Sequence, residues 1–326
     1  MIGDDSHPDD EPLLPDYGGA CVTGLVPALL EGSHEPDWLS HDLLAARRVL
    51  LLVLDGLGWN QLQQRRDVAP VLAALDGQPI TTVSPTTTSA ALTSISTGLP
   101  PGEHGVVGYR ISVDGSVLNA LRWTTADGDA RRRIDPAVFQ PYPVFGDQYP
   151  PVVTRAEFVG SGFTRAHLSA TRLVGYRGRH DMVDRTVGLL AAGEPFVYAY
   201  WDGIDRIAHE HGLGGRYDEE LADCDAMVAA LIDRVPPGTA VVVTADHGQV
   251  HVGERILDLP PEVTSCLEGQ SGEARFRWLH SRPGAAADLR AAAIGAFGQQ
   301  AWIRTLHEVE AECWLGPRLG TAARSR

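Results

Sequence analysis

Several features are scarce or missing in this chain, and each absence excludes a class of protein. No apolar run approaches the roughly 20 residues that a membrane-spanning helix needs, so no association with a membrane is expected. The first residues, MIGDDSHPDDEPLLPDYGG, have neither the basic start nor the apolar core of a secretory signal peptide. Four cysteines are present and none forms a CxxC pair, which is typical of free thiols in a reducing compartment. We therefore expect a cytoplasmic protein.

Basic residues are also scarce. Lysine and arginine number 27 against 42 aspartates and glutamates, which gives a formal net charge of -15. Such a surface repels a phosphate backbone, so a nucleic-acid polymer is not an expected partner. A small anionic substrate would need local help from metal ions or arginines. Hydrophobic residues make up 44% of the chain, which indicates a folded core; the oligomeric state stays unknown.

The chain shows no internal repeat, and its strongest segments are three apolar runs. These are Arg48–Asp55, Pro195–Trp201 and Thr239–Asp246. Runs without alternation indicate strands buried on both faces, as in a parallel sheet. Helical segments are expected around 59–75, 89–97, 217–234 and 285–297, and weaker strands at 79–83, 111–122 (a hairpin) and 275–280.

This alternation predicts an α/β fold with a mostly parallel central sheet and helices on both faces. Residues 1–20 are predicted to form a loose acidic leader. Residues 21–326 are predicted to form a single catalytic domain, with a cap or insertion around 105–190.

All three strong strands end at or near aspartates. Asp55 ends the first, Asp202 and Asp205 follow the second, and Asp246 ends the third. An isolated aspartate at a strand end is more often a helix cap or turn former. Parallel strands, however, end at one edge of a sheet, so these acids should converge and require cations.

Two histidines accompany these acids. Asp205 and His209 are spaced i, i+4, which places both on one face of a helix, and His247 directly follows Asp246. Taken alone, the first pair would more often be a surface pair and the second a turn. Together, aspartate and histidine are typical ligands of zinc, or of manganese where oxygen ligands dominate.

Four segments together resemble the signature blocks of the alkaline phosphatase superfamily. They are LLLVLDGLG (50–58), SPTTTSAALTSISTGLPPGEHGV (84–106), YWDGIDRIAHEHG (200–212) and VVVTADHGQV (241–250). They are most similar to the branch of type I phosphodiesterases and nucleotide pyrophosphatases. The resemblance spans residues 48–280 and implies an alkaline-phosphatase-like fold. It also implies two divalent metal ions, which we expect to be Zn²⁺, with Mn²⁺ as the alternative.

The resemblance implies a ligand set for each metal. Asp55, Thr88, Asp246 and His247 would hold one metal, while Asp205, His209 and a more C-terminal histidine would hold the other. Thr88 would be the nucleophile, because the family places this residue a fixed distance before Thr97-Gly98-Leu99. Its hydroxyl neighbours, Thr86, Thr87 and Ser89, leave a one-residue ambiguity.

The third histidine of the second site is open between two residues. His280 ends a short strand-like run and is our choice, and His251 is the competitor, only four residues past His247. A second open point is Tyr109. It occupies a position where the family has an asparagine that contacts a phosphoryl oxygen, and a tyrosine hydroxyl can also donate a hydrogen bond.

The chemistry expected from this set is hydrolysis of a phosphate ester through a phospho-threonine on Thr88. Metal coordination would lower the pKa of a threonine hydroxyl that is otherwise a poor nucleophile. We expect a phosphodiesterase or nucleotide pyrophosphatase that acts on a small phosphorylated substrate such as a nucleotide. Since Tyr109 replaces the family asparagine, a phosphomonoesterase, a phosphonoacetate-type hydrolase and a phosphomutase stay open as alternatives.

A protein of another class, a catalytically inactive binder of phosphorylated ligands, is also an alternative. The complete set of acids, histidines and Thr88 argues against it, because an inactive protein has no chemical need for all of them. A sulfatase is disfavoured, since no C/S-x-P-x-R motif stands at the nucleophile block.

Overall fold

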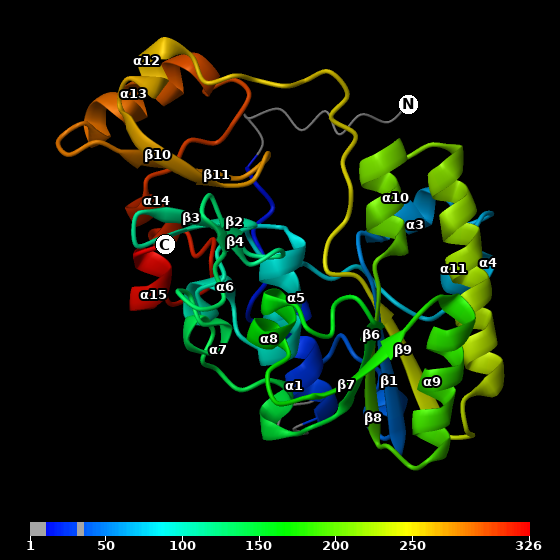
Figure 1. The fold of residues 1–326 in the computed structure, drawn as a ribbon. Helices are drawn as coiled ribbons and strands as arrows, with labels where there is room; N and C mark the ends of the chain where they lie inside the picture. The colour runs from blue at the N-terminus through cyan, green and yellow to red at the C-terminus, as the bar shows by residue number, and fades with distance from the viewer. Residues whose placement is uncertain (1–10, 31–35) are drawn as a thin grey trace.

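A computed structural model describes residues 11–30 and 36–326. Its centre is a five-stranded parallel sheet with the strand order β7-β6-β8-β1-β9. The bounds are β1 Arg48–Leu54, β6 Pro151–Arg155, β7 Arg172–Tyr176, β8 Phe196–Trp201 and β9 Thr239–Thr244. The three predicted strong strands are therefore β1, β8 and β9, lying side by side (Figure 1).

Helices cover both faces of this sheet, as Figure 1 shows. Successive residues of β1 pack on opposite sides: Leu51 and Val53 belong to one apolar core, Leu52 and Leu54 to the other. The first core includes side chains of α1 (Leu25–Leu30), α5 (Thr88–Thr97) and α8 (Gly162–His167). The second includes those of α4 (Pro70–Ala74), α9 (Arg179–Ala191), α10 (Gly203–His211) and α11 (Gly215–Arg234). The predicted α/β fold class is confirmed.

A second, antiparallel sheet has the order β11-β10-β2-β3-β4-β5. Its bounds are β2 Arg110–Val113, β3 Ser116–Asn119, β4 Thr124–Thr125, β5 Gly128–Asp129, β10 Leu267–Gly272 and β11 Arg277–Ser281. The remaining helical segments are η1 Val22–Gly24, α2 His41–Leu44, α3 Trp59–Gln64, α6 Pro101–His104, α7 Pro136–Phe139, η2 Phe145–Asp147, α12 Pro261–Thr264, α13 Ala286–Phe297, α14 Leu306–Ala311 and α15 Thr321–Arg324.

Three sequence-based expectations differ from the structure. The segment predicted as an insertion, 105–190, is divided: β2–β5 join the antiparallel sheet, while β6 and β7 complete the parallel one. The strand predicted at 79–83 is wrong, because only Thr81 forms a bridge, with Cys21. Of the predicted leader, residues 1–10 lie outside the described residues. Residues 16–20 are held in place, since the Tyr17 hydroxyl donates to the Trp314 carbonyl at 2.9 Å.

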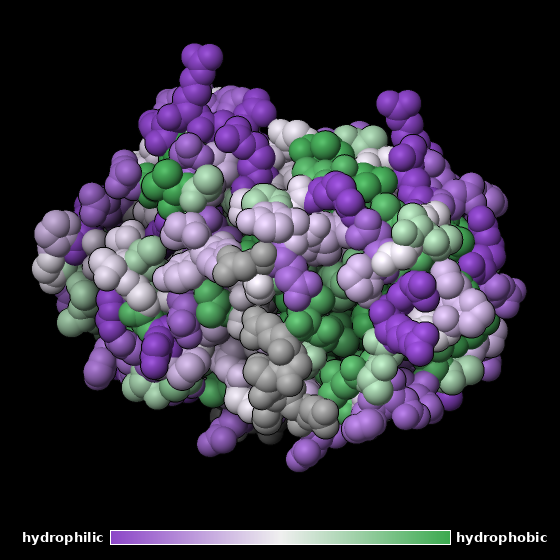
Figure 2. Space-filling view, turned by 90° about the horizontal axis from the view of Figure 1, so that it is seen from below, coloured by the Kyte–Doolittle hydropathy of each residue, from purple (hydrophilic) through white to green (hydrophobic). Residues whose placement is uncertain are grey.

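The carboxyl ends of the parallel strands lie toward α10, at the upper side of the molecule in Figure 1. Figure 2 looks at the opposite side, where hydrophobic residues gather over the middle of the face and hydrophilic residues surround them. Within the described part of the chain, no helix has both the length and the apolarity to span a membrane.

Candidate metal centre and nucleophile

Asp55 lies directly after β1, in the middle of the parallel sheet. Its backbone amide donates to the Trp201 carbonyl at 2.9 Å, which continues the pairing of β1 with β8, and its side chain is buried. The Tyr200 hydroxyl donates to Asp55 Oδ2. Gly56 follows with a φ of 74°, and a Cβ there would lie 3.0 Å from the Asp205 Cβ. Glycine at this position therefore lets the helix that carries Asp205 approach Asp55.

Asp246 and His247 follow β9, the neighbour of β1. Asp246 Oδ1 accepts hydrogen bonds from the amides of Gly56 and His247, at 3.1 and 2.9 Å, so it ties the ends of the two strands together. His247 Nδ1 lies 2.9 Å from the Gly248 carbonyl. A carbonyl only accepts, so Nδ1 carries a hydrogen, and Nε2 of the neutral ring keeps a lone pair. This is the tautomer in which Nε2 binds a metal.

Asp205 lies in the first turn of α10, which begins just after β8. Its Oδ1 accepts a hydrogen bond of 2.6 Å from the Gln249 side-chain amide, and His209 Nε2 lies 3.5 Å away from the same oxygen. The His209 side chain is 73% exposed, so its ring is open to solvent on one side of the acid. The i, i+4 spacing thus brings both side chains together, as the sequence predicted.

Thr88 is the first residue of α5. Its Oγ1 lies 3.0 Å from His247 Nε2, although the two residues are 159 positions apart in the chain. The hydroxyls of Thr86 and Ser89 donate to the carbonyls of Val83 and Gly108, at 2.9 and 2.8 Å. Among these neighbours the hydroxyl that contacts His247 is therefore that of Thr88, which stays the predicted nucleophile.

The carboxylates form one cluster around His247. Nε2 of His247 lies 3.3 Å from Asp55 Oδ1, 3.6 Å from Asp246 Oδ2 and 3.9 Å from Asp205 Oδ1. Ligand atoms of Asp55, Asp205 and His247 all lie within 4.8 Å of one another. The sheet edge therefore brings together acids from three separate segments, as the sequence predicted.

The charges of this cluster are not balanced by hydrogen bonds. Asp55 Oδ1 and Asp246 Oδ2 are buried and accept no hydrogen bond from a described residue. Burial, together with the charges of Asp246 and Asp205, raises the pKa of Asp55 well above its usual value. Burial likewise raises the pKa of Asp246. Burial opposes a charge on His247, but Asp246 and Asp205 outweigh it and raise the pKa of the ring.

A divalent cation fits this arrangement. Two unpaired carboxylate oxygens and the lone pair of an imidazole converge on a buried point, where acceptors repel one another unless a cation lies between them. Aspartate and histidine are the ligand types of zinc and manganese sites. The residues of the first predicted site, Asp55, Thr88, Asp246 and His247, are thus in mutual reach.

The two candidates for the third histidine of the second site are not part of this cluster. His280 is on β11 of the antiparallel sheet, where its Nε2 lies 2.8 Å from the Ser271 hydroxyl. His251 lies exposed in the segment after β9. Neither belongs to the described group of Asp55, Asp205 and His247. A third histidine ligand thus stays a prediction.

Tyr109 lies just before β2, and its hydroxyl accepts a 2.6 Å hydrogen bond from the Asn119 side-chain amide. The Asn119 side chain, contributed by β3, therefore lies beside Tyr109. Sequence reasoning did not identify Asn119, because its place opposite Tyr109 depends on the pairing of β2 with β3.

Three further residues at this edge were not identified from the sequence. Gln249 contacts Asp205, and Tyr200 contacts Asp55. Glu273, on the turn from β10 to β11, has its pKa raised to about 7 by burial. Of these three residues, only Tyr200 could be placed from the sequence. Residues two apart on a strand share a face of the sheet, so Tyr200 lies on the same face as Tyr198.

Comparison with known proteins gives the following matches. The family described as type I phosphodiesterase / nucleotide pyrophosphatase matches residues 49–296. The solved structure of murine ectonucleotide pyrophosphatase / phosphodiesterase 5 is similar with a TM-score of 0.57 and 18% identity, over 77% of this chain and 70% of that chain. The inactive form of that protein in complex with AMP gives the same TM-score and coverage at 17% identity.

Among curated proteins, GPI ethanolamine phosphate transferase 3 from Eremothecium gossypii is 33% identical over 84 residues. These residues are 25% of this chain and 7% of that transferase, so the match spans a small part of its length. The structural matches, at under 25% identity, show that the fold is alkaline-phosphatase-like.

Proposed function

Because this chain belongs to the type I phosphodiesterase / nucleotide pyrophosphatase family of the alkaline phosphatase superfamily, we propose that it hydrolyses phosphate esters with two divalent metal ions and Thr88 as the nucleophile. The observation that carries the proposal is the 3.0 Å contact of Thr88 Oγ1 with His247 Nε2, inside a cluster of buried acids. A threonine hydroxyl held among metal ligands is where the family chemistry requires its nucleophile.

Asp55, Thr88, Asp246 and His247 would hold one metal, and Asp205 with His209 would contribute to the other, with His280 as the proposed third histidine. When bound, the two metals would lower the pKa of the Thr88 hydroxyl and neutralise charge on the reacting phosphoryl group. We propose zinc as the metal, on the mixed aspartate and histidine ligand set.

The residues of the chain position the reacting groups. Thr88 begins α5, so its oxygen lies beside the free backbone amides of the first helical turn, which favour an anion. Thr88 Oγ1 attacks phosphorus, and the bond to the alcohol or nucleotide leaving group breaks. Water then cleaves the phospho-threonine. Each step inverts the configuration, so net retention at phosphorus is expected.

The ester class is proposed from residues near the start of α5, where the Ser89 hydroxyl donates to the carbonyl of Gly108, the residue before Tyr109. The Asn119 amide and the Tyr109 hydroxyl form a hydrogen-bonded pair on β3 and the approach to β2. We propose that one of these groups contacts a phosphoryl oxygen, as the family asparagine does, and that a nucleotide-type diester is the substrate. The AMP complex of the murine neighbour supports a nucleotide.

A substrate panel tests this function. The purified protein is assayed with bis-p-nitrophenyl phosphate, the p-nitrophenyl ester of thymidine monophosphate, p-nitrophenyl phosphate and phosphonoacetate, with zinc and again with manganese. We expect the two diesters to be hydrolysed fastest. If p-nitrophenyl phosphate or phosphonoacetate were hydrolysed faster, the substrate would be a monoester or a phosphonate and not a diester. If no compound were hydrolysed, a binding protein without catalysis would be favoured.

The nucleophile is tested by Thr88→Ala. We expect kcat/KM for the best diester to fall on the order of 10³-fold or more, because the variant lacks the hydroxyl that contacts His247. Thr86→Ala is the matched control, since the Thr86 hydroxyl is bonded to the Val83 carbonyl. Undiminished hydrolysis by Thr88→Ala, or an equal loss in Thr86→Ala, would show that Thr88 is not the nucleophile.

A further inference from the structure

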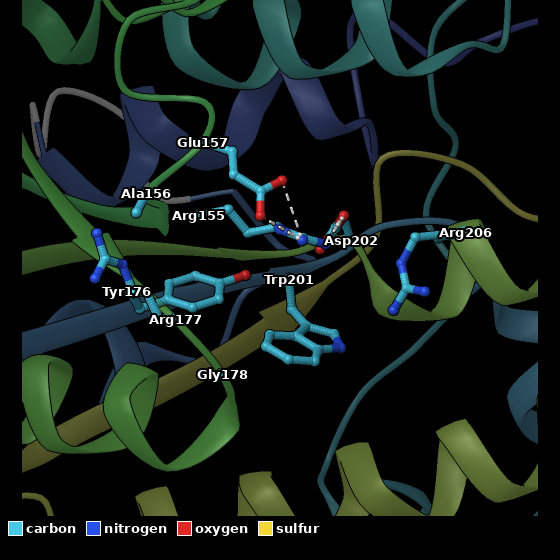
Figure 3. A pocket seen from close by; sticks show the side chains of 9 residues that line it. All are labelled: Arg155, Ala156, Glu157, Tyr176, Arg177, Gly178, Trp201, Asp202 and Arg206. Carbon is cyan, nitrogen blue, oxygen red and sulfur yellow. Dashed lines mark hydrogen bonds and ion pairs between the residues drawn. The ribbon is translucent and has the colours of Figure 1, made fainter.

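A cavity lies at the same edge of the sheet, where β6, β7 and β8 end. It has a volume of about 630 Å³ and is lined by Arg155, Ala156, Glu157, Tyr176, Arg177, Gly178, Trp201, Asp202 and Arg206 (Figure 3). A cavity of this size holds a small organic molecule. Its lining includes none of the residues assigned to the metal centre.

The cavity and the candidate metal centre both lie at the carboxyl ends of the parallel strands. Trp201 is the β8 partner of Leu54, the residue before Asp55, and neighbouring strands lie about 5 Å apart. Asp202 and Arg206 belong to the start of α10, the helix that also carries Asp205. The Trp201 and Tyr176 side chains lie on one face of the sheet, and Tyr200, which contacts Asp55, lies on the other. A substrate that occupied both places would therefore extend across the carboxyl edge of the sheet.

The lining carries a positive charge, in contrast to the protein as a whole. Three arginines face two carboxylates, which leaves one net positive charge in a chain of formal net charge -15. Both acids are already paired, because Arg155 binds Asp202 at 3.0 Å through Nη1 and Glu157 at 3.0 Å through Nη2. The one charge of Arg155 offsets only one of the two carboxylates, so the positive charge offered to an incoming anion lies on Arg177 and Arg206.

The other two arginines are not engaged. In the part of the chain that the structure describes, neither the Arg177 nor the Arg206 guanidinium makes a hydrogen bond or ion pair. Figure 3 shows them at opposite ends of the cavity, with Tyr176 and Trp201 between them. These two rings are stacked, with centroids 5.5 Å apart, so they form a rigid apolar wall.

We propose that this cavity binds a second anionic group of the substrate, a phosphate or a carboxylate remote from the reacting phosphorus, through Arg206 or Arg177. A guanidinium binds either group with two parallel hydrogen bonds. The proposal rests on the proposed phosphoesterase function and narrows its substrates to esters with two anionic groups. The cavity thereby favours binding of esters with two anionic groups over esters with one.

Calorimetric titration of the zinc-loaded protein tests the proposal. Two probe pairs differ by one anionic group: adenosine 3′,5′-bisphosphate against AMP for phosphate, and phosphoglycolate against methyl phosphate for carboxylate. We expect the doubly anionic probe of at least one pair to bind about tenfold more tightly, and the pair that shows this gain identifies the group. Equal Kd values within both pairs would overturn the proposal.

Variants of the lining arginines identify which residue produces the gain in affinity. Arg206→Met or Arg177→Met should abolish the gain, and the corresponding lysine variant should keep part of it, because the charge remains. Arg216→Met is the matched control, since Arg216 is exposed and lies outside the cavity. The site would be refuted if Arg216→Met lost the gain in affinity equally, or if neither Arg206→Met nor Arg177→Met lost it.

The outcome is independent of catalysis. Kd ratios are measured without turnover, so absence of hydrolysis in the substrate panel would reject the proposed function while the ratios still decide on the cavity. Thermal unfolding of each variant identifies a loss of fold. If a methionine variant does not fold, the Kd ratios of the lysine variant and the wild type are compared instead.

Discussion

At the scale of single residues, the candidate metal site brings together two buried carboxylate oxygens that have no hydrogen-bond partner among the described residues. Asp55 Oδ1 and Asp246 Oδ2 lie within 3.3 and 3.6 Å of the same histidine nitrogen, and neither accepts a hydrogen bond from a described residue. Burying like charges together costs free energy unless a cation compensates them. The acids therefore reduce the stability of the metal-free protein.

Asp55→Asn should reveal this cost. Burial and the neighbouring acids raise the pKa of Asp55, so its ionisation destabilises the metal-free fold as the pH rises through that pKa. The variant should be more stable than the wild type at pH 8–9, by about 1–3 kcal/mol in urea unfolding. It should also lose the stabilisation by zinc. Asp76→Asn, at an exposed position, is the control, and a less stable metal-free Asp55→Asn would contradict the argument.

His104 illustrates a buried histidine that is not a ligand. Nδ1 accepts from the Val106 amide at 3.1 Å, so Nε2 carries the hydrogen and donates to the Ser94 hydroxyl at 2.8 Å. Burial, with the charge of Arg326, lowers the pKa of this ring to about 3. The neutral ring thus connects α5 to the turn after α6.

This lowered pKa predicts a loss of stability in acid. Below pH 6.5 the unfolded chain binds a proton at His104 that the folded state does not, so stability falls as the pH decreases from 6.5 toward 3. At pH 4.5 the loss is about 2–3 kcal/mol. His104→Gln should show a shallower dependence on pH over this range in urea unfolding. Parallel curves for the two proteins would refute the prediction.

At the scale of elements, α8 connects the region around the antiparallel sheet to the parallel one. Trp123 lies between β3 and β4 and is buried. Its indole Nε1 donates to the Ile134 carbonyl at 2.7 Å, and its ring meets the Phe139 ring edge-on, with the ring centroids 5.3 Å apart. Gly162, the first residue of α8, lies against the ring: a Cβ there would be 2.3 Å from Trp123 Cγ. The close approach of α8 therefore requires glycine.

Gly162→Ala should displace Trp123 and lower the free energy of unfolding by about 1–3 kcal/mol, the usual cost of overpacking. Gly160→Ala is the control two residues away, because a Cβ there meets nothing within 4 Å. We expect the control to lie within about 1 kcal/mol of the wild type, or slightly above it. Urea unfolding at pH 7 measures both, and equal stabilities would show that α8 can move without cost.

At the scale of the whole molecule, metal binding should be coupled to folding. The cluster joins the ends of β1 and β9 with α5 and α10, which the unfolded chain does not hold together. A ligand that binds only the folded state stabilises it, by about 2.7 kcal/mol at one hundred times its Kd. Zinc should therefore raise the stability of the entire domain.

Removal of metal by a chelator should lower the Tm of the zinc-loaded wild type by about 5 °C or more. Asp246→Asn removes one ligand, so its Tm should respond less to zinc and to the chelator. Scanning calorimetry with and without zinc measures both proteins. An unchanged Tm of the wild type after chelation, with metal loss verified by elemental analysis, would argue against the site.

The sequence by itself determined the parallel core and the acids at its edge. β1, β8 and β9 are continuous apolar runs, and β1 and β8 are buried on both faces as predicted. For β9 the prediction of full burial is wrong: it is half-buried along its length, because it is an edge strand of the parallel sheet. Because parallel strands end at one edge, Asp55, Asp205 and Asp246 had to converge. β6 and β7 were missed, since PVVTR and RLVGY are short and mix apolar with polar residues.

Only the tertiary structure decided which groups touch. Thr88 and His247 meet across 159 residues, and Asn119 reaches Tyr109 through the register of β2 and β3. The arginine-lined cavity also needs three strand ends and the start of α10 to be adjacent. Such contacts depend on how strands and helices pack, because local sequence determines burial and strand direction but not the distance between side chains from separate segments.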